Sequence, residues 1–201
     1  MSASPAHMID IAFAIECEGL SREHRRALAA ALETALPWLA SLPGAAIHRL
    51  NLASGDGRQA LLSRHTRLTL RVPRERAADV LALGGSTLSV GGQALTLGPA
   101  QPRELLPHGT LYAHLVAADD ADEAAFLRAA DAELAALDVR CRLICGRHQV
   151  VESGVLQGFS LMLDGLSPKA ALRVLEAGLG RHRRLGCGVF VPHRSAAAVG
   201  G

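Results

Sequence analysis

Hydrophobic residues recur with two different periods in the first 40 residues of the chain. The run Met8–Cys17 is almost continuously apolar and ends at Glu18, which predicts a strand. After Ser21, an expected helix N-cap, the apolar residues take a helical spacing that Pro37 interrupts. We expect the helix to kink or end at this proline, and Trp38 to pack into the core. The apolar face of this helix consists of Leu28, Ala31, Leu32, Ala35, Leu36 and Leu39.

The next 60 residues continue to alternate between strand and helix patterns. A loop is predicted at residues 55–57, and Gly91 with Gly92 is predicted to turn a hairpin. Pro73 opens a second helix that extends to about Leu83. The predicted strands are a short one at Ala45–Leu52, a longer one at Leu61–Val72 and the hairpin Thr87–Leu97; His65, Arg67, Thr69 and Arg71 share the polar face of the second.

The second half of the chain repeats this order after a segment rich in proline. Residues 99–109 contain three prolines and are expected to form a linker. The helix predicted over Asp119–Leu137 carries acids in its first turn, where the helix dipole favours them. The remaining predicted segments are strands at Leu111–Ala117, Val139–Cys145, Val155–Leu163 and Val189–Pro192, and a helix that starts at Ser167 and ends at Gly178.

Both halves therefore follow the order β-α-β-β-α-β, which is typical of the ferredoxin-like motif. We predict an α+β protein with two tandem ferredoxin-like domains, at residues 1–98 and 110–194. Residues 99–109 would link the two domains, and residues 195–201 would form a flexible tail.

Composition narrows the class of protein. The chain has 201 residues, 49% of them hydrophobic, which leaves room for one ordinary domain or two small ones with a sizeable core. The sequence shows neither a signal peptide nor an apolar run of membrane-spanning length, so we expect a soluble, cytoplasmic protein without membrane contacts. Its cysteines are expected to be buried free thiols in a reducing compartment; they are Cys17, Cys141, Cys145 and Cys187.

Charge is unevenly distributed along the chain, although the formal net charge is +2. Five arginines and no acid lie between Gly57 and Arg74, whereas Asp119–Asp138 contains seven acids and one arginine. This asymmetry predicts one basic face and one solvated acidic face.

The stretch between Gly178 and Arg194 combines four glycines, three clustered arginines and two histidines, and no acid follows Glu176. Its spacing fits neither a Rossmann loop nor a P-loop. One interpretation is a helix C-cap at Gly178 or Gly180 followed by a surface turn. The arginines favour a second interpretation, a cradle for a phosphate backbone. We call this segment the glycine-rich loop; its candidate binding residues are Gly178, Gly180, Arg181, His182, Arg183, Arg184, Gly186 and Gly188.

The glycine-rich loop, Gly-Leu-Gly-Arg-His-Arg-Arg-Leu-Gly-Cys-Gly-Val-Phe-Val-Pro, resembles the C-terminal loop of the RAMP superfamily. More narrowly, the chain resembles the CRISPR-associated endoribonucleases that process repeat RNA, in the short MYXAN-subtype branch. That family is built from two tandem ferredoxin-like domains, in agreement with the order derived above. The similarity extends over about residues 8–194 and includes Leu36–Leu39, Ile47 with His48, Leu68–Pro73 and Gly158–Leu161.

The resemblance implies cleavage of precursor CRISPR RNA within its repeats, without metal or cofactor, to give mature guide RNA. In that chemistry the ribose 2′-hydroxyl attacks the adjacent phosphate and leaves a 2′,3′-cyclic phosphate, with help from a general base, a general acid and cations. Implied partners are CRISPR repeat RNA and other subunits of a CRISPR effector complex. Two alternatives stay open: a non-catalytic RNA-binding RAMP subunit of such a complex, and a ferredoxin-like metabolite-binding module, which leaves the basic loop unexplained.

Nine histidines compete for the proton-transfer role. His24 is the first candidate, because the resemblance implies a catalytic histidine in the opening turn of the first helix. There the positive helix end disfavours the imidazolium and attracts phosphate. The alternative is a solvated histidine on a polar helix face. His48 is the second candidate, while His182 and His193 suit RNA contacts better.

Arginines outside the glycine-rich loop are further candidate RNA contacts. Arg67 and Arg71 would either follow RNA phosphates or form a solvated strand face. Arg140, Arg142 and Arg147, on the hairpin of the second domain, are stronger candidates, because the deep groove of A-form RNA favours backbone contacts.

By residue type, Cys141, Cys145 and His148 could supply three zinc ligands, with Cys187 as a fourth. Two cysteines four residues apart on one extended strand lie about 13 Å from each other, too far to bind one tetrahedral ion. We therefore expect core thiols and no metal.

Overall fold

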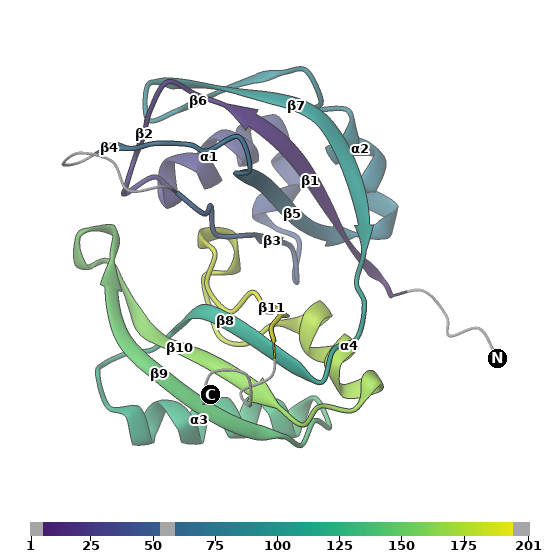
Figure 1. Ribbon diagram of the computed structural model, residues 1–201, viewed down its shortest axis with the longest axis vertical. Coiled ribbons are helices and arrows are strands. Elements are labelled where there is room, and N and C mark those ends of the chain that lie inside the picture. Colours follow the sequence, from purple (N-terminus) through teal and green to yellow (C-terminus); the bar gives the residue numbers. More distant parts are fainter. Residues whose placement is uncertain (1–5, 53–58, 195–201) are drawn as a thin grey trace. The chain divides into compact units, whose positions relative to one another are not determined.

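The computed structural model describes residues 6–52 and 59–194 (Figure 1). The chain divides into two compact units, Met1–Glu104 and Leu105–Gly201. The loop expected at residues 55–57 and the tail expected at residues 195–201 lie outside the described residues.

The first unit is built on a five-stranded antiparallel sheet in the order β3-β5-β1-β7-β6, and Figure 1 shows α1 and α2 packed against one face of it. With β6 set aside as a hairpin partner of β7, the other strands and the two helices follow the predicted β-α-β-β-α-β order. β2 and β4 form a separate pair. The elements are β1 (Met8–Glu16), β2 (Leu20–Ser21), α1 (Arg25–Ala35), η1 (Pro37–Ala40), β3 (Ala46–Ile47), β4 (Gln59–Ala60), β5 (Arg67–Pro73), η2 (Arg74–Arg76), α2 (Ala77–Leu81), β6 (Thr87–Val90) and β7 (Gln93–Glu104).

The two ends of α1 agree only in part with the predicted start and stop signals. The helix ends before Pro37, as predicted. Its N-cap is His24 and not Ser21, because the Ser21 hydroxyl accepts a hydrogen bond from Glu23 N–H at 3.2 Å, before the helix begins. Trp38 is half-buried instead of lying in the core, and the Arg76 guanidinium lies over its ring at 5.3 Å.

Three strand boundaries predicted in this unit are wrong. The short strand expected over Ala45–Leu52 is limited to β3 at Ala46–Ile47. β5 starts at Arg67, because Thr66 N–H donates to Ser63 O at 2.9 Å in a turn that contains His65. β7 continues through residues 99–104 and pairs with β1 as far as Glu104, so this part of the expected linker is strand. β6 pairs with β7 only as far as Thr96. Beyond Thr96 one edge of β7 is therefore not paired with β6, and this edge tolerates prolines because they have no N–H to donate.

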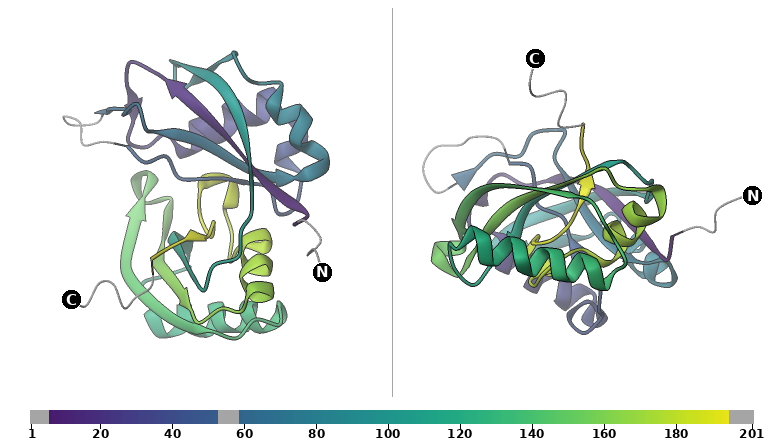
Figure 2. Two further views of the ribbon diagram at one scale, coloured as in Figure 1. Left: turned by 45° about the vertical axis from the view of Figure 1, so that its right-hand side comes forward. Right: turned by 90° about the horizontal axis from the view of Figure 1, so that it is seen from below.

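The second unit contains a four-stranded antiparallel sheet in the order β11-β8-β10-β9. Figure 2, right, shows α3 running along this sheet. β8, the first strand of the motif, lies between β10 and β11, which are its third and fourth strands. In the first unit β1 lies in the same way between β5 and β7. The elements are β8 (Thr110–Ala117), α3 (Glu123–Ala136), β9 (Arg142–Val151), η3 (Glu152–Gly154), β10 (Leu156–Asp164), α4 (Pro168–Ala177), η4 (Arg183–Leu185) and β11 (Val191–Pro192).

Capping explains the helices of the second unit. α4 begins as predicted, with the Ser167 hydroxyl accepting from Ala170 N–H at 3.3 Å and Pro168 in the first turn. α3 begins at Glu123, four residues after the predicted start at Asp119, because Asp122 is its N-cap. β9 lies later than the predicted Val139–Cys145, since Val139 N–H still bonds to Leu134 O at 2.9 Å and closes the end of α3.

The core of the second unit joins aromatic and aliphatic residues. The rings of Phe126 on α3 and Phe159 on β10 stack at 4.8 Å. Cys187 is fully buried with Leu115 and Leu156. The four cysteines are free, as expected, although Cys17, Cys141 and Cys145 are half-buried.

Within residues 6–52 and 59–194, none of the helices has the length and apolar character needed to span a bilayer.

Candidate functional site

His24 lies at the N-terminus of α1, directly before the first helical residue. Its carbonyl accepts the first helical hydrogen bond, from Leu28 N–H at 2.8 Å. The residue is 6% exposed, so the interpretation as a solvated histidine is wrong. The expected position at the start of the first helix is confirmed, while the catalytic role stays a prediction.

The imidazole of His24 is oriented by the backbone in front of the helix. Nδ1 lies 2.9 Å from Ser21 O and 3.2 Å from Arg22 O. A carbonyl oxygen can only accept, so these contacts assign the ring hydrogen to Nδ1. In the neutral ring Nε2 then carries the lone pair. The side chain of His24 lines a cavity of about 260 Å³, together with residues of the β6–β7 hairpin.

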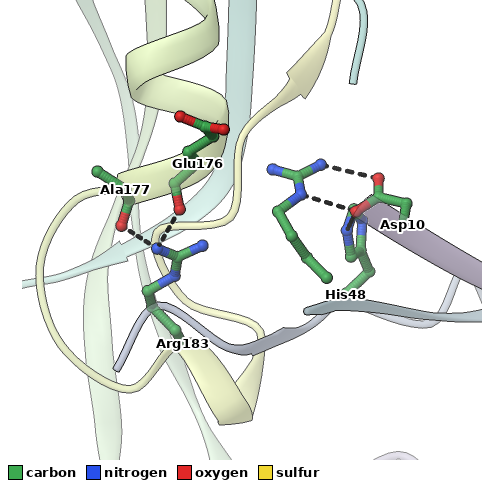
Figure 3. A network of polar contacts seen from close by, with 6 residues as sticks. Asp10, His48, Glu176, Ala177 and Arg183 are labelled. Carbon is green, nitrogen blue, oxygen red and sulfur yellow. Dashed lines mark hydrogen bonds and ion pairs between the residues drawn. The ribbon is translucent and has the colours of Figure 1, made fainter. Parts of the chain in front are cut away.

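His48 belongs to a different polar cluster in the first unit (Figure 3). Its Nε2 lies 3.3 Å from Asp10 Oδ1, and Arg71 donates to both carboxylate oxygens of Asp10, at 2.7 and 2.9 Å. Asp10 on β1 and Arg71 on β5 are direct register partners. Burial by itself raises the pKa of Asp10, but the hydrogen bonds from Arg71 and His48 outweigh it and hold that pKa well below its usual range.

Arg71 is 1% exposed, so its interpretation as part of a solvated strand face is wrong, and the Asp10 carboxylate neutralises its guanidinium. Its expected RNA contact stays a prediction. Asp10 was missed at the sequence level, although a signal existed: it is a lone acid in the apolar run before Glu16. Arg67 is also engaged locally, since its Nη1 donates to Arg64 O at 2.8 Å and to Thr66 O at 2.9 Å. Its expected RNA contact stays a prediction.

The glycines of the glycine-rich loop shape the backbone of the second unit. Gly178 is the C-cap of α4 with φ +65°, which confirms that part of the first interpretation. A Cβ on Gly188 would lie 1.7 Å from Leu179 O, so this position requires a glycine for close approach. The four glycine N–H groups donate within the unit, from Gly178 to Val174 O, from Gly180 to Glu133 Oε2, from Gly186 to Arg183 O and from Gly188 to Leu115 O. A cradle made of these four amides is therefore not supported.

The arginines of the loop have partners that lie far away in the sequence. Although no acid follows Glu176 in the sequence, Arg181 pairs with Asp119, which lies 62 residues earlier in the chain. Arg183 Nη1 donates to Glu176 O at 3.0 Å and to Ala177 O, and thereby satisfies carbonyls in the last turn of α4 (Figure 3). His182 is exposed and left-handed with φ +64°, and Arg184 is half-buried.

The three candidate arginines on or just before β9 differ in their surroundings. Arg147 is exposed on β9, and Arg140 is exposed just before that strand. Arg142 donates to Asp164 Oδ2 at 2.8 Å, so part of its charge is neutralised. Arg140 and Arg147 thus remain the stronger candidates of the three for binding a polyanion.

The described residues bring no three His, Cys, Asp or Glu side chains together in a way that would hold an ion. Burial is the main cause that raises the pKa of Cys141 to about 11, with smaller contributions from Asp131 and Asp164. This thiol is therefore protonated at neutral pH.

Comparison with known proteins identifies the family. A family model described as Cas6 Crispr matches residues 9–195. The CRISPR-associated endonuclease Cas6 of Myxococcus xanthus (strain DK1622) is 36% identical over 194 residues, which is 95% of this chain and 84% of the relative.

Two solved structures share the fold at low sequence identity. A Cas6-related protein from Pyrococcus furiosus superposes with a TM-score of 0.64 at 11% identity, covering 92% of this chain and 98% of that one. A RAMP protein that binds different RNA substrates superposes with a TM-score of 0.59 at 12% identity, covering 90% and 98%. These likenesses confirm the predicted fold of tandem ferredoxin-like domains. Because the family model spans nearly the whole chain and the relative is similar over the same length, this chain belongs to the Cas6 family of CRISPR-associated proteins.

Proposed function

We propose that this protein is an endoribonuclease that cuts precursor CRISPR RNA within its repeats, by attack of a ribose 2′-hydroxyl on the adjacent phosphate and without a metal ion. Two facts support the proposal at the level of the family: the chain belongs to the Cas6 family, and its 36% identical relative is named an endonuclease. The observation that carries the mechanism is the geometry of His24, a buried imidazole held by backbone carbonyls at a helix N-terminus.

His24 suits the role of general base. With its hydrogen on Nδ1, the neutral ring accepts the proton of the 2′-hydroxyl at Nε2. The 2′-oxygen then bonds to phosphorus while the bond from phosphorus to the 5′-oxygen breaks, and the leaving oxygen takes up a proton. The products are a 2′,3′-cyclic phosphate and a 5′-hydroxyl. The positive end of α1, beside His24, would stabilise the charge that develops on the phosphate.

RNA binding would use arginine side chains more than loop amides. Arg140, Arg147 and Arg184 in the second unit, with the exposed His182, supply donors for phosphate oxygens. The glycine-rich loop contributes by holding the chain in the shape that presents its side chains. Arg183 supports this shape through the carbonyls at the end of α4.

The proposal is tested with repeat RNA from the protein's own array, in the presence of EDTA. We expect the wild type to cut once per repeat and to leave a cyclic phosphate, which acid converts to a monoester. His24→Ala should slow single-turnover cleavage at least about 100-fold with RNA affinity retained. His48→Ala is the matched control, because His48 lies in the Asp10 cluster.

Three outcomes would contradict the proposal. Cleavage that is abolished by EDTA and restored by Mg²⁺ would reject the metal-independent mechanism. A His48→Ala variant that binds without cutting, beside an active His24→Ala variant, would exchange the assigned roles. A wild type that binds repeat RNA and never cuts it would favour a non-catalytic RNA-binding subunit.

A further inference from the structure

A cavity of about 260 Å³ lies beside His24 within the first unit. It is bounded by the segment around β2, the start of α1 and the β6–β7 hairpin. The proposed chemistry gives no role to this space, although it adjoins the imidazole that would take the proton. Its size and lining indicate what it can hold.

Small and apolar residues form much of the wall. Leu20 and Val90 are buried, and Ala27 faces the hairpin turn at Gly91. A Cβ on Gly91, which has φ +58°, would lie 3.6 Å from Ala27 Cβ, so the two walls are close at this point. Neither arginine nor lysine is among the described lining residues, which disfavours a phosphate group as the occupant. A flat, largely apolar ring fits such walls better.

Polar groups at the rim supply hydrogen bonds of the kind that base edges use. Glu23 and Gln93, both exposed, are among the residues that line the cavity. A carboxylate accepts, and an amide both donates and accepts, so together they match the ring N–H or amino group and the carbonyl or ring nitrogen of a nucleobase. RNA-binding proteins commonly recognise unstacked bases in this way.

The reaction itself gives a reason for a base pocket at this place. In-line attack requires the 2′-oxygen, the phosphorus and the leaving 5′-oxygen to lie on one line, which a stacked A-form strand does not provide. The nucleotide that supplies the 2′-hydroxyl must therefore turn out of the stack, and a site that holds its base would fix the ribose next to His24.

We propose that this cavity binds the base of the nucleotide on the 5′ side of the scissile phosphate and so aligns its 2′-hydroxyl with His24. The inference rests on the proposed function. It assigns Ala27, Gly91 and Gln93 to substrate positioning, a role that the arginine contacts do not supply.

The test fills the cavity from α1. Ala27→Leu places a larger side chain in the lining, and Ala30→Leu makes the same change on the exposed face of the same helix. We expect Ala27→Leu to lower the single-turnover rate at least tenfold and Ala30→Leu to leave it unchanged. Affinity for an uncleavable RNA, with 2′-deoxyribose at the cut site, should change less than threefold in both variants. Gln93→Ala, at the exposed start of β7, provides a second variant and should lower the rate about threefold.

RNA with an abasic ribose identifies the base that is bound. With the wild type, an abasic site 5′ of the scissile phosphate should slow cleavage as much as Ala27→Leu does, and combining the two should add nothing. Equal cleavage of abasic and normal RNA, or an Ala27→Leu variant as fast as the wild type, would overturn the pocket while leaving the endoribonuclease in place. An effect from the 3′ side alone would also overturn it. A wild type that cuts no repeat RNA would overturn both the function and the pocket.

Discussion

Arg71 and Asp10 face each other across the β1–β5 ladder, and the guanidinium donates to both carboxylate oxygens, at 2.7 and 2.9 Å. His48 approaches the same carboxylate from the end of β3 at 3.3 Å. Three neighbouring strands of the first unit are thus joined by one acid. Because bidentate pairs of arginine and carboxylate are strong and directional, we expect this cluster to contribute to stability.

The first prediction concerns pH. The pKa of Asp10 is lower in the folded protein than in the unfolded chain, where it is about 3.9. The folded state therefore binds fewer protons, and the contribution of Asp10 to stability is complete above the unfolded pKa. It is lost as the pH falls through the folded pKa. Urea unfolding should show Asp10→Asn destabilised by about 3 kcal/mol at pH 7, because the variant leaves Arg71 without its anion.

The difference between Asp10→Asn and the wild type should narrow as the pH falls below about 4, because the unfolded wild-type chain then takes up a proton at Asp10 that the folded protein does not bind, which lowers the free energy of unfolding of the wild type alone. Asp79→Asn serves as the control, because Asp79 forms an exposed ion pair with Arg76 and should have little effect at either pH. A difference between Asp10→Asn and the wild type that is the same at pH 3 and pH 7 would contradict the assignment of the shift to Asp10.

Patterns within a segment predicted much of the fold. The apolar periods gave the order of strands and helices, and Ser167 with Pro168 marked the start of α4. Boundaries were predicted wrongly where pairing with a strand distant in the sequence determines the structure. Prolines suggested a linker at residues 99–104, yet the segment pairs with β1 along an edge that tolerates them. Local sequence does not reveal which edge of a strand is paired.

The sequence predicted the position of the candidate histidine, but it did not predict the partners of the loop arginines. The position of His24 at a helix N-terminus followed from local pattern and from resemblance. The partners of the loop arginines did not, because Asp119 precedes Arg181 by 62 residues and the acceptors of Arg183 are main-chain carbonyls. Counting the acids near the loop in the sequence reveals neither the distant carboxylate that pairs with Arg181 nor the main-chain carbonyls that accept from Arg183.

The second prediction separates backbone strain from close approach in the glycine-rich loop. Gly188 and Gly165 both have positive φ, +63° and +78°, but a Cβ meets Leu179 O at 1.7 Å at the first and nothing within 4 Å at the second. Gly165→Ala should cost about 1 kcal/mol from strain alone. Gly188→Ala should cost at least about 3 kcal/mol, because the loop must also open. Denaturant unfolding of the two variants measures the difference, and equal losses would contradict the close approach.

The third prediction concerns the ion pair of Arg181 and Asp119, both of which are exposed. In the free protein Asp119 competes with any RNA phosphate for this arginine. Asp119→Asn should therefore raise the affinity for repeat RNA at low salt by about threefold or more. It should also steepen the dependence of log affinity on log salt by about 0.7 to 0.9, the value for one added phosphate contact. Binding titrations at several salt concentrations measure both quantities.

Two variants show whether the gain comes from Arg181 or from the change in net charge. Asp120→Asn removes one neighbouring negative charge, and its side-chain oxygen can still accept from Asp122 N–H as Asp120 does at 2.9 Å. It should raise the affinity much less and leave the salt slope unchanged, because no arginine is released. Adding Arg181→Gln to Asp119→Asn should abolish the gain. If the double variant keeps the higher affinity, the freed phosphate contact belongs to another cation, and Arg181 does not bind RNA.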